Sequence, residues 1–307
     1  MADIQSFGKK LVGNLEKVIV GKRQTLDMIV VGLLCQGHIL IEDVPGVGKT
    51  VLARSLAKSL GCSFNRLQFT PDMLPSDVTG VSIFDQQKRS FEFRPGPVFS
   101  QIVLVDEINR ATPKTQAALL EAMEEKQVTV EGQTRPLPQP FFVIATQNPH
   151  DQLGTYALPE SQLDRFHMRI SLGYPDRAAE RELLRGGDRR DRVDSLPAVL
   201  TLPELQALQQ AVLQVHVADP LLNYMQDLLA TTRSGRWFLQ GLSPRAGLAI
   251  LRAAKAQAFL SGRDYVAPDD IAAILPQTAS HRLVPVSHAG RGATEQVRAM
   301  LDAVPLP

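Results

Sequence analysis

The sequence has few cysteines, few aromatic residues and no excess of charge of either sign. Its two cysteines, Cys35 and Cys62, do not form a Cys-x-x-Cys pair, so a dense disulfide framework is excluded. We expect both thiols to pack as small apolar side chains. The 33 basic and 32 acidic residues give a net charge of +1, and aromatic residues make up 6% of the chain. This balance argues against a nucleic-acid-binding protein.

Long apolar segments are also lacking. The longest apolar run, residues 28–35, is far shorter than the roughly 20 residues that a helix needs to span a bilayer. The N-terminal residues contain no continuous apolar region of the kind found in secretory signals. We therefore expect a cytoplasmic protein with no membrane span. The histidines show no metal-ligand spacing and no G-x-S-x-G motif occurs, so neither structural zinc nor a serine hydrolase is predicted.

The first half of the chain alternates short apolar runs with helical patterns. Continuous apolar character predicts buried strands at residues 38–42, 101–106 and 141–146. Helical patterns follow the first two strands, at residues 49–60 and 113–125. Strands that are covered on both faces and alternate with helices are typical of a parallel sheet. The predicted fold class is therefore α/β.

Two stretches rich in glycine and proline or split by a glycine interrupt this alternation. Residues 73–99 contain two glycines and three prolines, which predicts an insertion that carries a hairpin. Gly132 separates the short runs 127–131 and 133–140, which predicts a second hairpin just before the third strand.

The character of the sequence changes after Pro175. Residues 177–194 are rich in alternating charges and are predicted to form a solvated helix face and a linker. Helical patterns follow at residues 202–215, 221–231, 244–260 and 268–275, the third of them opened by an N-cap serine and a proline. We therefore divide the chain into an α/β domain, residues 1–176, and an all-helical domain, residues 177–307.

A glycine-rich turn joins the first predicted strand to the first predicted helix, as in a phosphate-binding P-loop. Its residues are Pro45, Gly46, Val47, Gly48, Lys49, Thr50 and Val51. Backbone N–H groups of such a turn cradle phosphate at a helix N-terminus. Lys49 is expected to reach the β- and γ-phosphates, and the Thr50 hydroxyl to ligate Mg²⁺. Asp43 replaces the first glycine of the usual pattern, which leaves the turn possible and puts a carboxylate near the site.

Paired carboxylates end the second predicted strand. Asp106 is expected to lie beside the metal ion, and Glu107 to activate the attacking water as a general base. Two carboxylates at a strand end are also common at the start of a solvated loop. Their position beside a P-loop favours the catalytic interpretation.

Three further polar residues could complete such a site. Asn148 follows the third strand and could bind both a water and a γ-phosphate oxygen, although an asparagine before proline is often only a turn residue. Arg165 could serve as an arginine finger, although Asp164 beside it suggests a surface ion pair. Arg245 lies in the first turn of the helix that Ser243 caps, where a cation is mildly unfavourable unless it faces an anion.

These motifs resemble the MoxR family of AAA+ ATPases. The matching segments are VIVGK (18–22), LIEDVPGVGKT (40–50), LVDEINRATPKTQAALLEAMEE (104–125), ATQNP (145–149), LPESQLDRF (158–166) and GLSPRAGLAILRAAKAQAFLSGRDYVAPDDI (241–271). The resemblance implies a five-stranded, ASCE-type P-loop NTPase core with a helical lid. It also implies ATP, Mg²⁺ and a homo-oligomeric ring, usually a hexamer, with nucleotide sites between subunits. The two hairpins then correspond to the helix-2 insert and the hairpin before sensor 1, which face the pore or the substrate.

The resemblance also gives each candidate residue a family role. Lys49 and Thr50 correspond to Walker A, Asp106 and Glu107 to Walker B, Asn148 to sensor 1, Arg165 to the arginine finger, Arg245 to sensor 2, and Val20 and Gly21 to the adenine pocket. Asp43 resembles the residue that the family itself uses at this position. We expect Lys49 and Arg245 of one chain, joined by Arg165 of a neighbouring chain, to stabilise the transferred phosphoryl group.

Three functions are compatible with this sequence. The first is Mg-dependent ATP hydrolysis coupled to chaperone-like remodelling or assembly of a client protein, which the resemblance suggests could carry a von Willebrand factor A domain. The second is a DNA-dependent AAA+ motor, for which the first hairpin offers Lys88, Arg89 and Arg94 but the second offers only Arg135. The third is a nucleotide-gated scaffold with little turnover, against which Glu107 and Arg165 argue.

Overall fold

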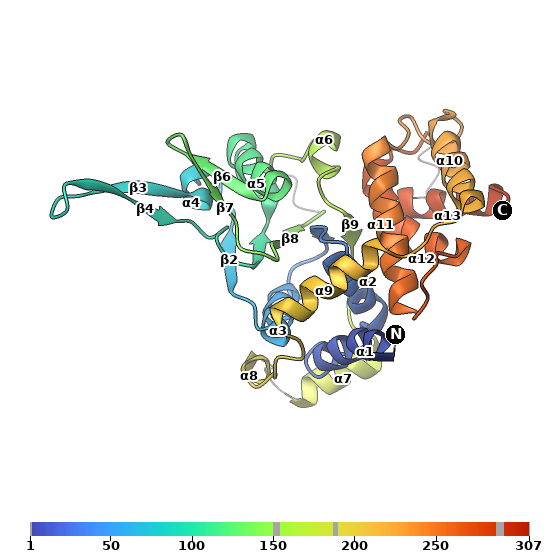
Figure 1. Cartoon of the computed structure of the whole chain (residues 1–307), viewed down its shortest axis with the longest axis horizontal. Coiled ribbons are helices and arrows are strands. Elements are labelled where there is room, and N and C mark those ends of the chain that lie inside the picture. The colour runs from blue at the N-terminus through green and yellow to red at the C-terminus, as the bar shows by residue number, and fades with distance from the viewer. Residues whose placement is uncertain (1, 150–153, 187–189, 287–291, 307) are drawn as a thin grey trace.

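The computed structural model describes residues 2–149, 154–186, 190–286 and 292–306. At its centre lies a five-stranded parallel sheet in the order β2-β5-β8-β1-β9 (Figure 1). Its strands are β1 (Ile39–Glu42), β2 (Phe64–Gln68), β5 (Ile102–Asp106), β8 (Phe142–Gln147) and β9 (Met168–Ile170). The α/β fold with a parallel sheet is confirmed. The edge strands β2 and β9 were not among the predicted strands.

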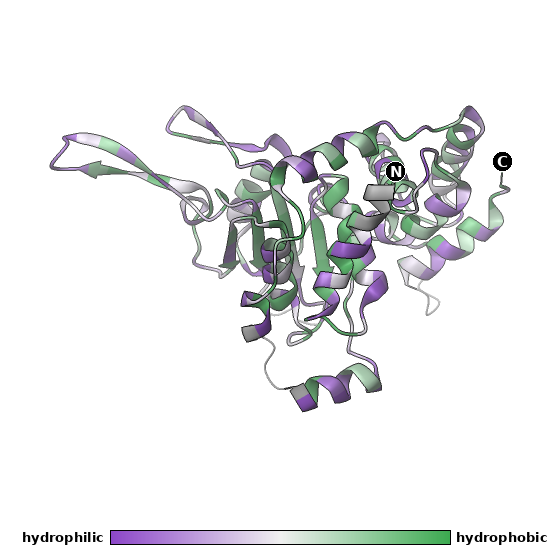
Figure 2. Ribbon diagram, turned by 60° about the horizontal axis from the view of Figure 1, so that its bottom comes forward, coloured by the Kyte–Doolittle hydropathy of each residue, from purple (hydrophilic) through white to green (hydrophobic). Residues whose placement is uncertain are grey.

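Helices cover both faces of the central sheet, and the strand side chains that they bury are apolar (Figure 2). Along β1 the side chains alternate between two hydrophobic clusters: Ile39 and Ile41 belong to one, and Leu40 belongs to the other. Burial of each such side chain stabilises the fold by roughly 1.5–3 kcal/mol. The first cluster contains residues of α1 (Ala2–Glu16), α2 (Arg23–Leu34) and α3 (Lys49–Leu60), and the second contains residues of α5 (Pro113–Glu125).

Parallel register brings the carboxyl ends of the inner strands to one edge of the sheet. Gln68 lies beside Asp106, and Glu42 lies beside Gln147. The loops that leave β1, β5 and β8 therefore start close together. This edge is where α/β proteins bind their ligands.

Both predicted hairpins are present. The first follows α4 (Pro75–Thr79) and consists of β3 (Gly80–Asp85) and β4 (Ser90–Pro95). The second consists of β6 (Gln127–Val130) and β7 (Gln133–Pro136). Both hairpins project from the end of the molecule opposite to the C-terminal helices (Figure 1).

The base of the first hairpin requires glycine. A Cβ atom on Gly80 would lie 2.4 Å from the carbonyl oxygen of Arg94, and one on Gly96 would lie 2.4 Å from the amide nitrogen of Gly80. Because these neighbours are backbone atoms, they cannot move aside without opening the hairpin.

The rest of the described chain is helical. After η1 (Ile108–Arg110) and α6 (Glu160–Leu163) in the core, the helices are α7 (Arg177–Gly186), α8 (Arg190–Asp194), α9 (Leu202–Leu213), α10 (Asp219–Arg233), α11 (Pro244–Leu260), α12 (Pro268–Ala279), η2 (Ser280–Arg282) and α13 (Ala293–Ala303). Ser243 caps α11 as expected, since its hydroxyl accepts a hydrogen bond from the Ala246 N–H at 3.1 Å. Helix α12 continues four residues beyond the predicted end, and α13 was not predicted.

The helical part packs closely against the core. Gln209 of α9 donates to the carbonyl oxygen of Leu33 in α2 at 2.8 Å, and Arg54 of α3 pairs with Asp194 of α8 at 3.1 Å. Residues of α9, α11 and α12 belong to the same hydrophobic cluster as α1 to α3. The division at residues 176 and 177 stays a prediction.

Candidate active site

The turn between β1 and α3 has the backbone of a phosphate cradle. Gly46 and Gly48 have φ angles of +87° and +96°, a region that favours glycine. A Cβ atom built on either glycine would have no neighbour within 4 Å, so the backbone of the turn borders open space. Gly48 is the N-cap of α3. The N-terminal amides of this helix border a cavity of about 730 Å³.

Lys49 lies at the base of this cradle. Its Nζ atom donates a hydrogen bond to the carbonyl oxygen of Asp43 at 2.8 Å. Burial lowers the pKa of Lys49, while the nearby carboxylates of Asp43, Asp106 and Glu107 oppose this shift. Lys49 lines the same cavity as Asp106 and Glu107, as a group that binds phosphate beside a metal ion would.

The Asp43 side chain has a structural role. Its Oδ2 atom accepts hydrogen bonds from the Ser171 hydroxyl at 3.1 Å, the Leu172 N–H at 2.6 Å and the Gly173 N–H at 2.8 Å. Asp43 is buried and is not among the described residues that line the cavity. The carboxylate thus ties the P-loop to the segment after β9, a role that the sequence pattern did not reveal.

Replacing Asp43 by alanine is expected to loosen the P-loop. The variant leaves the N–H groups of Leu172 and Gly173 without an acceptor, which costs about 1–3 kcal/mol per buried donor. We expect a lower thermal unfolding temperature and at least about tenfold weaker ATP binding, measured by calorimetry. Asp43→Asn keeps one acceptor oxygen and should lose less on both scales. Unchanged unfolding and binding in the alanine variant would contradict this role.

The Asp106 carboxylate at the end of β5 is held by two side chains. Arg66 of β2 donates to Oδ2 from its Nε atom at 2.7 Å, and the Thr146 hydroxyl donates to Oδ1 at 3.2 Å. The same Thr146 oxygen accepts from the Glu107 N–H at 3.0 Å. Thr146 therefore fixes both acidic residues relative to β8.

Glu107 adopts a left-handed backbone conformation with φ of +56°, which is strained for a residue other than glycine. Its Oε2 atom accepts from Gln68 Nε2 at 2.7 Å and pairs with Arg110 Nε at 3.0 Å. All three residues line the cavity beside the P-loop. Strained backbone is typical of functional sites, and here it orients the carboxylate toward the open cavity.

Nine of the predicted site residues therefore line one cavity, and Val47 of the P-loop is not among its described lining residues. The nine are Pro45, Gly46, Gly48, Lys49, Thr50, Val51, Asp106, Glu107 and Asn148, which follows β8. Sequence analysis missed Arg66, Gln68 and Thr146. Arg66 and Gln68 lie two residues apart on β2. This strand is too short, and too mixed in polar and apolar residues, to be recognised from the sequence. Thr146 had a signal, since it stands two residues before Asn148 in the third predicted strand.

Arg165 and Arg245 lie elsewhere. Arg165 NH1 pairs with Glu124 Oε2 at 3.2 Å, and Arg245 contacts the Oε1 atom of the same carboxylate. Both arginines line a second cavity, of about 320 Å³, that shares no described lining residue with the P-loop cavity. The expectation that Arg245 joins Lys49 of its own chain does not fit this arrangement, because α11 carries Arg245 to the α5 and α6 side of the core.

Val20 and Gly21, the predicted adenine segment, lie in the loop between α1 and α2. They are not among the described residues that line the P-loop cavity. A Cβ atom on Gly21, whose φ is +70°, would lie 3.0 Å from the Ala179 side chain of α7. Lys22 donates to the carbonyl oxygen of Tyr174 at 2.6 Å, so this loop is fixed to the chain that connects β9 to α7.

Comparisons with known proteins agree with this geometry. Residues 38–168 match the model of the ATPase family associated with various cellular activities (AAA), and residues 231–301 match the AAA lid domain. The chain is 40% identical to Chaperone MoxR1 of Mycobacterium tuberculosis, over 90% of this chain and 75% of that protein. It is 30% identical to Protein MoxR of Methylorubrum extorquens, over 100% and 97% of the two chains. The chain belongs to the MoxR family of AAA+ ATPases.

A solved structure supports the same assignment. It is the structure of a candidate ATPase from Cytophaga hutchinsonii. The two chains superpose with a TM-score of 0.91 at 37% identity, over 100% of this chain and 96% of that one. In this MoxR-family ATPase the AAA match runs from the start of β1 to β9, and the lid match from α10 to α13. The predicted α/β AAA+ fold with a helical lid is confirmed. Among the described helices, none has the length and apolar character needed to cross a bilayer.

The P-loop cavity of the MoxR-family chain fits a magnesium-bound triphosphate. Backbone amides and the Lys49 ammonium group suit phosphate oxygens, and the Thr50 hydroxyl and Asp106 carboxylate are the hard oxygen ligands that Mg²⁺ prefers. In the described part of the chain, no group of three or more His, Cys, Asp or Glu residues is placed to hold a metal ion.

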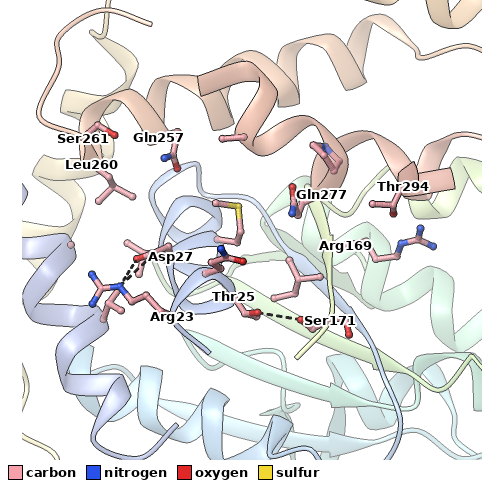
Figure 3. A pocket seen from close by; sticks show the side chains of 18 of the residues that line it. Arg23, Thr25, Asp27, Arg169, Ser171, Gln257, Leu260, Ser261, Gln277 and Thr294 are labelled. Carbon is pink, nitrogen blue, oxygen red and sulfur yellow. Dashed lines mark hydrogen bonds and ion pairs between the residues drawn. The ribbon is translucent and has the colours of Figure 1, made fainter. Parts of the chain in front are cut away.

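A larger cavity, of about 840 Å³, lies between α1, α2 and β9 on one side and α11 to α13 on the other (Figure 3). It lacks a glycine-rich turn. Two of its arginines are already paired, Arg23 with Asp27 at 3.4 Å and Arg169 with Glu42 at 3.0 Å. This larger cavity therefore does not resemble a nucleotide site.

Proposed function

We propose that this chain binds ATP with Mg²⁺ and hydrolyses it, and that the turnover drives chaperone-like remodelling or assembly of a client protein. One observation carries the proposal: Lys49, Thr50, Asp106, Glu107 and Asn148, which come from three separate segments, line one cavity at the carboxyl edge of the sheet. This is the edge at which α/β proteins bind ligands.

The residues divide the work of phosphoryl transfer. The P-loop amides and Lys49 bind the phosphates, and Thr50 and Asp106 hold the metal ion. Mg²⁺ supplies charge neutralisation at the phosphate oxygens. Glu107 accepts a proton from the attacking water, and its bonds to Gln68 and Arg110 fix the orientation of the carboxylate. Asn148 offers an uncharged amide to the water or to a phosphate oxygen.

The position of Arg165 supports a ring assembled from copies of this chain, for which we propose six subunits. The arginine lines a cavity separate from its own P-loop, so the nucleotide that it stabilises belongs to a neighbouring subunit. An arginine supplied in trans can contribute about 10³–10⁵-fold to the rate.

Specific ATPase activity is therefore expected to rise with protein concentration as rings form. A sharper measurement mixes two inactive variants, Lys49→Ala and Arg165→Ala. The first retains the arginine and the second retains the P-loop, so mixed rings should recover part of the phosphate release. Mixtures that stay as inactive as either variant alone would contradict action in trans.

The chaperone-like part of the proposal draws on the relatives, one of which is named Chaperone MoxR1. A client with a von Willebrand factor A domain is part of the same proposal. The first hairpin offers exposed apolar side chains to a client, with Phe91 69% and Phe84 50% exposed. The two cysteines are unpaired, which supports a cytoplasmic location.

The alternatives receive less support. Lys88 on the first hairpin pairs with Glu92 at 3.3 Å, and Arg135 on the second lies 4.0 Å over the Phe93 ring, so these cations are engaged locally. That disfavours a DNA-dependent motor. The oriented Glu107 carboxylate favours turnover over a nucleotide-gated scaffold.

A further inference from the structure

Glu124, at the end of α5, bridges the two arginines that lie away from the P-loop. One of its carboxylate oxygens contacts Arg165 at 3.2 Å and the other contacts Arg245. The two guanidinium groups come from different parts of the fold, since Arg165 follows α6 and Arg245 lies in the first turn of α11. In this arrangement they already act together on a single anionic group.

The surroundings favour a further anion. The basic residues that line this cavity are Lys126, Arg165, Arg245, Arg252 and Arg282. Its described lining contains only two carboxylates, Glu124 and Asp164. Burial together with the nearby arginines lowers the pKa of His167 to about 3, so this buried imidazole stays neutral. The cavity therefore carries an excess of positive charge.

Asp164 is committed to holding the lid against the core. Its Oδ1 atom accepts from Arg282 Nε at 2.6 Å, and its Oδ2 atom accepts from the Ser243 hydroxyl at 3.4 Å. Asp164 precedes Arg165, and Ser243 lies two residues before Arg245. The contacts of Asp164 with Arg282 and Ser243 thus hold the two segments that carry Arg165 and Arg245. Of the two lining carboxylates, Glu124 is the one that neutralises these arginines.

We propose that Glu124 is a positioning residue that occupies the place of a phosphate group: in the isolated chain it holds Arg165 and Arg245 as a pair, and it yields them to the terminal phosphate of the nucleotide bound by a second copy. This inference rests on the proposed function and deepens it. A carboxylate and a phosphate cannot share the pair without repulsion, so each new subunit contact must displace Glu124.

The proposal makes Glu124 an internal competitor of ring assembly. Glu124→Gln removes the competing charge and keeps an acceptor oxygen of similar reach. In nucleotide-loaded chains the variant should therefore assemble at a lower protein concentration than the unaltered sequence. Glu125→Gln is the matched control, because Glu125 is the next residue of the same helix and is exposed.

The test uses the full chain in the Glu107→Gln background, so that bound magnesium-ATP persists. Sedimentation velocity gives the protein concentration at half assembly. We expect it to fall about tenfold for Glu124→Gln relative to Glu125→Gln, with the difference shrinking as salt is raised. The shift should disappear when Arg165 and Arg245 are both replaced by alanine, which a general effect on α5 packing would not predict. Glu124→Asp, too short to bridge both arginines, serves as a second variant.

The outcomes separate this inference from the proposed function. If the control assembles with ATP and Glu124→Gln assembles at the same or a higher concentration, the role of Glu124 is overturned while the ring remains. If the control does not respond to ATP at any concentration, the action of the arginines on a second copy fails, and the role of Glu124 fails with it.

Discussion

Replacing Glu107 by glutamine is expected to leave ATP binding intact and to lower the rate of hydrolysis by about 10²–10⁴-fold. Glutamine has the same length and can still accept the hydrogen bond from Gln68, so the left-handed turn that carries residue 107 should persist. What it cannot do is accept a proton from water. Steady-state phosphate release and calorimetric ATP binding measure the two effects separately.

Two further variants are compared with Glu107→Gln. Lys49→Ala should lose binding as well as turnover, because it removes the ammonium group that faces the phosphates. Gln68→Ala should keep binding and lose part of the turnover, because the Glu107 carboxylate then retains only its bond to Arg110. Phosphate release at the wild-type rate by Glu107→Gln would show that another group activates the water.

The sequence predicted the elements that carry the candidate site residues well where chemistry and local structure coincide. The P-loop needs glycines at fixed offsets before a helix, and α3 begins at Lys49 as expected. The paired carboxylates need a buried strand to deliver them, and continuous apolar character revealed β5. In both cases one short segment contains the whole signal, so no knowledge of distant contacts is required.

The sequence could not predict what depends on packing between distant segments. Arg245 was expected beside its own P-loop, whereas the lid carries it to Glu124, a residue that gave no signal within a helix rich in glutamate. Asp43 was expected to put a carboxylate near the site, and its partners prove to be the Ser171 hydroxyl and the N–H groups of Leu172 and Gly173. The alternative interpretation of Arg165, a surface ion pair with Asp164, does not hold, because Asp164 pairs with Arg282.

Mild acid is expected to destabilise this protein, because it buries neutral histidines. Burial lowers the pKa of His38 to about 4, and burial with Arg282 and Arg252 lowers that of His167 to about 3. His281 is shifted well downward for the same reason. In the unfolded chain these imidazoles titrate near 6.5, so protons bind the unfolded state more readily.

The stabilising contribution of each neutral imidazole is complete above pH 6.5 and is lost as the pH falls toward the folded pKa. At pH 5 each of His38 and His167 should have lost about 2 kcal/mol, against a total stability on the order of 5–15 kcal/mol. Urea unfolding at a series of pH values between 7 and 4.5 measures this loss.

His38 offers the sharpest test, because its hydrogen bonds specify the neutral ring. Nδ1 accepts from the Val143 N–H at 3.0 Å, which leaves Nε2 to donate to the carbonyl oxygen of Met123 at 3.0 Å. A proton on Nδ1 would place two donors face to face. In His38→Asn, which does not titrate, the slope of stability against pH between 5 and 6.5 should fall by about 1 kcal/mol per pH unit. His216→Asn, at an exposed position, is the control, and equal slopes in the two variants would mean that His38 does not govern the acid response.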